Sequence, residues 1–220
     1  MGKRQKTLEQ LFRDAGYPIG IRKLPRPSVR ARGAGPKSMW AEVERVYKQL
    51  DGALAACPLQ TGQWDMEIGD VAVELDEEQH FNRYRLITLE STLYSAQSSF
   101  PLGDYQSHCK LYERECLSKA ANRGYWSSDS TIKQFGPASP LGDLRPPGAP
   151  RWKQRAFYDF LKDLAPEITG TSVARISIWE TVEVNKCPVR VCDILDRSMQ
   201  VAVPILAELI GGRAGARLTF

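Results

Sequence analysis

The stretch from residue 63 to residue 76 constrains the fold most, because two short alternating runs flank the dipeptide Gly69-Asp70. Apolar and polar residues alternate in the runs WDMEI (64–68) and VAVELD (71–76). Period-two alternation predicts two half-buried strands, and glycine at the first central position suits a type II′ hairpin turn. The turn fixes the expected pairing: Ile68 against Val71 and Met66 against Val73, with Asp65 directly opposite Glu74.

Two carboxylates that face each other across a hairpin repel, which destabilises the sheet. A divalent cation that prefers hard oxygen ligands, such as Mg²⁺ or Mn²⁺, is the expected neutraliser. Asp65 and Glu74 would hold this ion. Asp76, which shares their face, would add a ligand or orient an attacking water. The alternative is a solvent-facing sheet with an ordinary acidic face.

A chain of 220 residues is long enough to bury a full core in one domain. Its composition, 42% hydrophobic and 25% charged, argues against general disorder. The sequence contains no apolar run of the length that spans a bilayer. Five cysteines without a disulfide-scaffold spacing indicate reduced thiols and a cytoplasmic location.

Positive charge is concentrated at the N-terminus: residues 1–37 hold ten Lys or Arg against two acids, in a chain of net charge +4. Thr7 opens a capping-box pattern for a short helix that ends near Gly16. Residues 18–37 are rich in Pro, Gly and Arg and predict an extended linker. We therefore expect a basic arm over 1–37 that contacts a polyanion, with nucleic acid first. The alternative is a merely solubilising arm.

Helical periodicity predicts further helices at about 38–56, 104–121 and 151–164, and a final helical region after Asp193 that restarts at Pro204. Residues 173–180 alternate as another strand. The order of these elements predicts a mixed α/β or α+β domain over 38–220. The segment from about 90 to 150 is expected to be an insertion, and it offers a possible docking surface for a protein partner.

The arrangement resembles the restriction-endonuclease-like nucleases, the PD-(D/E)XK superfamily, in which a helix carrying Glu precedes an acidic hairpin. Asp65 matches the first acid and Glu74 the second, Asp76 stands where Lys is usual, and Glu44 (less favourably Glu42) matches the helical Glu. The resemblance implies a central mixed sheet whose acidic hairpin is flanked by helices. It also implies Asp65, Glu74, Asp76 and Glu44 as catalytic residues, and a magnesium-dependent endonuclease activity.

Within this superfamily, the run VELDEEQHF (73–81) is similar to the branch related to very-short-patch-repair endonucleases, which place a His shortly after the acidic strand. The runs RAFYD (155–159) and ISIWE (176–180) are similar to the closing helix and strand of that branch. The resemblance covers residues 38–180 in outline. His80, four residues after Asp76, is accordingly a candidate general acid or base, with a surface histidine as the alternative.

The helix predicted at 151–164 carries Gln154, Tyr158 and Lys162 on one stripe. The Gln-x-x-x-Tyr spacing is similar to a motif that lines the active site beside DNA in exonuclease-type members of the superfamily. The alternative is a solvated polar stripe. The remaining candidate nucleic-acid contacts are basic residues beside this motif and after the hairpin: Lys153, Arg155, Arg83 and Arg85.

Four cysteines, Cys109, Cys116, Cys187 and Cys192, lack the tight spacing of zinc sites, and buried thiols are the favoured reading. The leading hypothesis is a metal-dependent nuclease that hydrolyses the phosphodiester bonds of nucleic acid, with DNA preferred over RNA. Two alternatives stay open. One is a nucleic-acid-binding protein that keeps this fold without the chemistry, and the other is an interaction subunit of a bacterial assembly.

Overall fold

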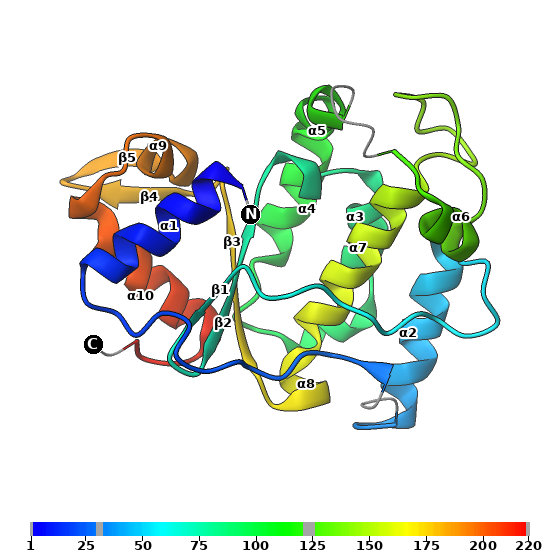
Figure 1. The fold of residues 1–220 in the computed structure, drawn as a ribbon, viewed down its shortest axis with the longest axis horizontal. Coiled ribbons are helices and arrows are strands. Elements are labelled where there is room, and N and C mark those ends of the chain that lie inside the picture. Colours follow the sequence, from blue (N-terminus) through cyan, green and yellow to red (C-terminus); the bar gives the residue numbers. More distant parts are fainter. Residues whose placement is uncertain (1, 30–32, 121–125, 219–220) are drawn as a thin grey trace. The chain divides into compact units, whose positions relative to one another are not determined.

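The computed structural model describes residues 2–29, 33–120 and 126–218, which form a mixed α+β protein, as predicted (Figure 1). The chain divides into two compact units. Unit 1 is built from three segments, Met1–Arg26, Gln63–Glu77 and Gly170–Phe220. Unit 2 contains Pro27–Gly62 and Glu78–Thr169.

Unit 1 holds both sheets. Its elements are α1 (Lys3–Asp14), β1 (Met66–Ile68), β2 (Val71–Asp76), β3 (Ser172–Ser177), β4 (Thr181–Val184), β5 (Cys187–Arg190), α9 (Val191–Asp196), η4 (Gln200–Ala202) and α10 (Val203–Ala214). In the first sheet β1 pairs antiparallel with β2, and β2 pairs parallel with β3. The second sheet is the antiparallel pair β4–β5, which the sequence analysis missed. The predicted strand 173–180 therefore ends at Ser177, and a separate hairpin begins at Thr181.

The core of unit 1 lies on the apolar face of the first sheet. Alternate residues of β2 and β3 enter it, together with residues of α1, α9 and α10. From the strands these are Val71, Val73, Leu75, Ala174 and Ile176. Because successive strand residues point to opposite faces, the residues between them, including Glu74 and Asp76, lie on the other face.

The N-terminal segment differs from the detached arm that the sequence predicted. Helix α1 begins at Lys3 instead of Thr7, and Leu8, Leu11 and Phe12 are buried in the core of unit 1. Residues up to Arg26 therefore belong to unit 1, so removing 1–37 would expose this core. Arg30 and Arg32 of the predicted arm lie outside the described residues.

Unit 2 is helical in its described part. Its elements are α2 (Lys37–Gln49), η2 (Glu78–His80), α3 (Arg83–Leu89), η3 (Thr92–Ala96), α4 (Leu102–Leu111), α5 (Glu113–Ala120), α6 (Asp129–Phe135), α7 (Pro150–Asp163) and α8 (Ala165–Thr169). The helix predicted at 38–56 ends at Gln49, and Asp51 follows with a φ of 60°, which a continuing helix cannot contain. The helix predicted at 104–121 is divided between α4 and α5, and Ala121 lies outside the described residues.

Aromatic side chains fill the centre of unit 2 around α7. Tyr47 of α2 lies 5.3 Å from Phe135 and 5.1 Å from Phe157 between ring centroids. Tyr105 and Phe135 come from the segment predicted to be an insertion, and both are buried. That segment therefore contributes to the core of unit 2. In the described part of the chain, no helix is long and apolar enough to cross a membrane.

Candidate functional site: an acidic sheet face and a His–Asp pair

The hairpin has the predicted register. Ile68 pairs with Val71 and Met66 with Val73, so the next pair outward is Asp65 and Glu74. Gly69 begins the turn at a φ of 55°, a conformation that glycine adopts without strain. Asp65 lies just before the first residue of β1 and extends this register by one residue.

Each of the two carboxylates accepts a hydrogen bond from a backbone N–H on the other side of the hairpin. Leu75 N donates to Asp65 Oδ2 at 2.9 Å, and Asp65 N donates to Glu74 Oε1 at 3.3 Å. Gln5 of α1 adds a third restraint, because its side chain donates to the Asp65 carbonyl at 2.7 Å. Backbone hydrogen bonds therefore hold the two acids next to each other.

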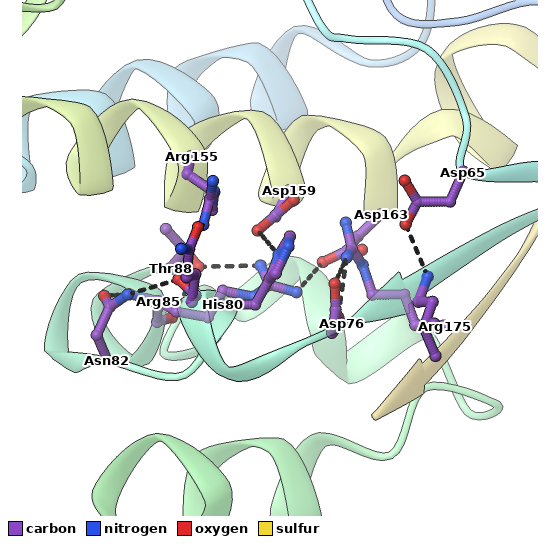
Figure 2. Close-up of polar contacts among 12 residues, drawn as sticks. Asp65, Asp76, His80, Asn82, Arg85, Thr88, Arg155, Asp159, Asp163 and Arg175 are labelled. Carbon is purple, nitrogen blue, oxygen red and sulfur yellow. Dashed lines mark hydrogen bonds and ion pairs between the residues drawn. The ribbon is translucent and has the colours of Figure 1, made fainter. Parts of the chain in front are cut away.

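A buried arginine joins this face from β3. Arg175 pairs with Glu74 in the parallel register, and its Nη1 lies 2.6 Å from Oδ1 and 2.9 Å from Oδ2 of Asp76 (Figure 2). The side chains of Arg175 and Asp76 are each 1% exposed. The sequence predicted only a metal ion as the neutralising charge, and this guanidinium was not predicted. The available signal was a charged residue in the middle of the mainly apolar run VARIS (173–177).

In unit 2, His80 pairs with Asp159 of α7. His80 Nδ1 lies 2.8 Å from Asp159 Oδ2, and the Asp159 side chain is 6% exposed (Figure 2). If Nδ1 carries the proton, the imidazole lone pair lies on Nε2, where it can accept a proton or bind a metal. The η2 turn that carries His80 is itself anchored, because Arg155 donates to Gln79 at 2.6 Å. Sequence analysis selected His80 but missed Asp159.

Within unit 2, His80 and Asp159 offer an imidazole nitrogen and a carboxylate oxygen that could serve as metal ligands. Carboxylate oxygen and imidazole nitrogen together suit Mn²⁺ and Zn²⁺, whereas the oxygen-only pair of Asp65 and Glu74 suits Mg²⁺.

The helical glutamates of α2 have local partners in unit 2. Both oxygens of Glu44 lie 3.1 Å from the backbone N of Cys57, so this carboxylate ties the chain after α2 back to the helix. Glu42 accepts from Arg45 and from Ser91, and the hydrogen bond from Arg45 is the main reason that its pKa falls to about 2. These contacts give both glutamates a structural role in unit 2.

Two of the predicted nucleic-acid contacts are corrected by their burial. The Arg85 side chain is 1% exposed and donates to Asp163 at 2.6 Å. The Lys153 side chain is also 1% exposed, and its Nζ lies 2.5 Å from Asp51 Oδ2 and 2.7 Å from the Pro147 carbonyl. Side chains enclosed in this way cannot reach a phosphate. Both residues hold unit 2 together.

The Gln-x-x-x-Tyr pair has the predicted spacing, but it faces a neighbouring helix. Gln154 Nε2 donates to Gln134 Oε1 of α6 at 2.8 Å, and the Tyr158 hydroxyl donates to the same oxygen at 3.2 Å. Gln154 is buried, and burial raises the pKa of Tyr158. The alternative, a solvent-facing polar stripe, is therefore wrong for Gln154 and for Lys162, which is also buried.

The remaining basic candidates lie nearer the surface of unit 2. Arg155 is half-buried and contacts Gln79. Arg83 is exposed and forms a salt bridge of 2.8 Å with Glu113, whose hydrogen bond raises the Arg83 pKa. Of the basic candidates, Arg83 and Arg155 therefore stay accessible to a polyanion.

The cysteines are free thiols, and no cysteine joins the candidate metal group of the described residues. Burial raises the pKa of Cys116 to about 12. A thiol in that state is a poor nucleophile and a poor metal ligand. Cys187 is exposed, and the other four are buried.

Comparison with known proteins gives one match, to a family model. No curated protein and no solved structure matches the chain. The model of the family of unknown function DUF7255 matches residues 45–197, which is more than half of the chain. The matched region includes the acidic hairpin, the His80–Asp159 pair and Arg175. The chain therefore belongs to the family of unknown function DUF7255.

Proposed function

We propose that the protein is a metal-dependent nuclease that hydrolyses phosphodiester bonds of nucleic acid, with DNA as the preferred substrate. The observation that carries the proposal is the pair Asp65 and Glu74, which hydrogen bonds hold next to each other in the β1–β2 hairpin. Two adjacent carboxylates are a fitting donor set for Mg²⁺ or Mn²⁺. A bound divalent ion would stabilise the negative charge that develops on a phosphate during hydrolysis.

A restriction-endonuclease-like core is part of the proposal. It is supported by the antiparallel pair β1–β2, the parallel pair β2–β3, and the helices that the chain forms between β2 and β3. The free cysteines are consistent with the proposed cytoplasmic location.

Within unit 2, His80 and Asp159 form a pair that is capable of proton transfer. Asp159 holds the Nδ1 side of the ring, so Nε2 is the atom that would take a proton from water or deliver one to the leaving oxygen. Asp76 occupies the position at which the PD-(D/E)XK pattern usually has Lys.

A second candidate is a nucleic-acid-binding protein of the same fold without hydrolytic activity. The observation that favours it is the ion pair of Asp76 and Arg175, which stabilises part of the acidic face without a metal. The low exposure of Glu74, 2%, points the same way, because a substrate phosphate must reach an active carboxylate or its ion. An interaction subunit would instead show a stable protein partner and no salt-dependent affinity for nucleic acid.

A cleavage screen separates the first two candidates. Plasmid, single-stranded and mismatched DNA and a matched RNA are incubated with Mg²⁺ or Mn²⁺ and the wild-type protein, Asp65→Asn or Asp70→Asn. Asp70 lies in the same hairpin, at its exposed turn, so Asp70→Asn is the matched control. The nuclease proposal predicts metal-dependent cleavage that Asp65→Asn abolishes and Asp70→Asn retains. Salt-dependent binding without cleavage by any of the three proteins would favour the second candidate.

A further inference from the structure

Arg175 is a charged residue in a position that normally takes an apolar one. It lies in the middle of β3, a strand whose other face carries Ala174 and Ile176 into the core. Arg175 itself is 2% exposed. Enclosing a guanidinium is unfavourable unless a charged or polar partner compensates, so a residue here is expected to have a specific electrostatic role.

The role follows from its contacts on the acidic face. One nitrogen, Nη1, lies within hydrogen-bond distance of both oxygens of Asp76, at 2.6 and 2.9 Å. The register places Arg175 beside Glu74, and Asp65 is opposite Glu74 on the far side. By this register, Asp65, Glu74 and Arg175 are neighbours across three adjacent chain segments. Asp76 is the next residue of β2 on the same face as Glu74.

We propose that Arg175 is the resident counter-cation of Asp76, and that it confines divalent-cation binding on this sheet face to Asp65 and Glu74. The inference rests on the proposed function and specifies its metal site. Because Arg175 engages both oxygens of Asp76, a metal that used Asp76 as a ligand would have to compete with the guanidinium. Arg175 acts on the bound ion through Asp76 and through its own charge, so it is a positioning residue.

The proposal predicts how charge changes alter metal affinity. Arg175→Met removes the positive charge and releases Asp76, so Mn²⁺ should bind about tenfold or more tightly, as expected for unit charges a few ångströms apart in a partly buried site. Asp76→Asn leaves the ligands Asp65 and Glu74 in place and should weaken Mn²⁺ binding without abolishing it. The double variant Asp76→Asn/Arg175→Met replaces the ion pair by two neutral residues and should return the affinity to near that of wild type.

The test is calorimetric titration of the metal-free protein with Mn²⁺, combined with thermal unfolding in chelator. Wild type should bind one equivalent at the hairpin. Each single variant should unfold at a lower temperature than wild type, because it leaves a buried charge without its partner, and the double variant should recover part of that loss. The double variant also keeps the test decisive if Arg175→Met does not fold. Arg190→Met, an exposed arginine of β5, is the control and should change neither readout.

Two results would overturn the proposal. Complete loss of Mn²⁺ binding in Asp76→Asn would make Asp76 a ligand, and an unchanged affinity in both Arg175→Met and the double variant would deny Arg175 any influence on the ion. Failure of the proposed function gives a different result, because wild type then binds no Mn²⁺. The claim that Asp65 and Glu74 bind the ion would then be wrong. In that case the unfolding temperatures in chelator still decide whether Arg175 and Asp76 are coupled.

Discussion

Each unit buries one arginine against one aspartate, and the two sites differ in what surrounds the pair. In unit 2, Arg85 contacts Asp163, and the other donors and acceptors around the pair include the hydroxyls of Thr88 and Tyr94. In unit 1, Arg175 contacts Asp76 in a row that also contains Glu74 and Asp65. Neutral hydroxyls surround the ion pair of unit 2, whereas the additional carboxylates beside the ion pair of unit 1 are the ligands of the proposed cation site. The groups around each ion pair, more than the pair itself, distinguish a purely structural ion pair from one in the proposed metal site.

Replacing Arg85 tests the structural side of this comparison and has the largest expected effect on stability. Arg85→Met should lower the free energy of unfolding by about 3–5 kcal/mol, because Asp163 is left buried without its cation. Arg83→Met, two residues away, breaks a salt bridge whose arginine side chain is 49% exposed and should cost at most about 1 kcal/mol. Denaturant unfolding measures both. Equal effects would remove the distinction between the buried and the exposed arginine.

Lys153 extends the comparison to a buried cation whose acidic partner, Asp51, is exposed to solvent. The Asp51 side chain is 67% exposed, so Lys153→Met leaves a solvated carboxylate. The expected cost is about 1 kcal/mol, mainly from the lost hydrogen bond to the Pro147 carbonyl. A cost as large as that of Arg85→Met, measured in the same denaturant series, would mean that partner burial does not set the penalty.

His108 offers a pH-dependent contribution that belongs to unit 2 alone. It packs against Phe81, Tyr105 and Tyr112, and burial lowers its pKa while Asp104 opposes this shift. The unfolded chain therefore binds the proton more readily than the folded one. Stability should be full at pH 7.5 and should fall as the pH drops below about 6.5, by at most about 1.4 kcal/mol per pH unit.

The measurement for His108 is denaturant unfolding of wild type and His108→Gln at pH 7.5 and 5.5. The glutamine variant should lose less stability between the two values than wild type does. An identical loss in both proteins would assign the pH dependence to other groups.

Cysteine labelling has the smallest energetic consequence and tests burial directly. Cys187 is exposed, whereas Cys116 is buried with its pKa raised to about 12. A thiol reagent at pH 8 should therefore modify Cys187 first in the native protein. Cys187→Ser should lose this fast phase, and Zn²⁺ should not protect it. Fast labelling of Cys116 would show that α5 opens readily.

The hairpin could be predicted from sequence because its information is local. Strict alternation on both sides of Gly69-Asp70 leaves one register that buries Val71, Val73 and Met66 together. The mixed α+β class follows from the same kind of local pattern. The short strands β4 and β5 did not, because four residues each carry too little periodicity.

The partners of the site residues could not be predicted because they are distant in sequence. Asp76 and Arg175 are 99 residues apart, and His80 and Asp159 are 79 apart. The exposure that was predicted for Arg85 and Lys153 is wrong for the same reason. A lysine or arginine on a helix normally indicates a solvent-exposed position, and its buried partner is distant in sequence. Most residues of α7 are buried, so its polar residues Lys153 and Gln154 contact other parts of the protein.

The most direct test of the central claim is Glu74→Gln, assayed for metal-dependent cleavage and for stability in chelator. Glutamine retains an oxygen that can accept from Asp65 N, so the hairpin should stay folded. The account predicts that cleavage is lost and that the metal-free melting temperature is equal to or above that of wild type, because one of two facing acids is gone. Cleavage at the wild-type rate by Glu74→Gln would contradict it.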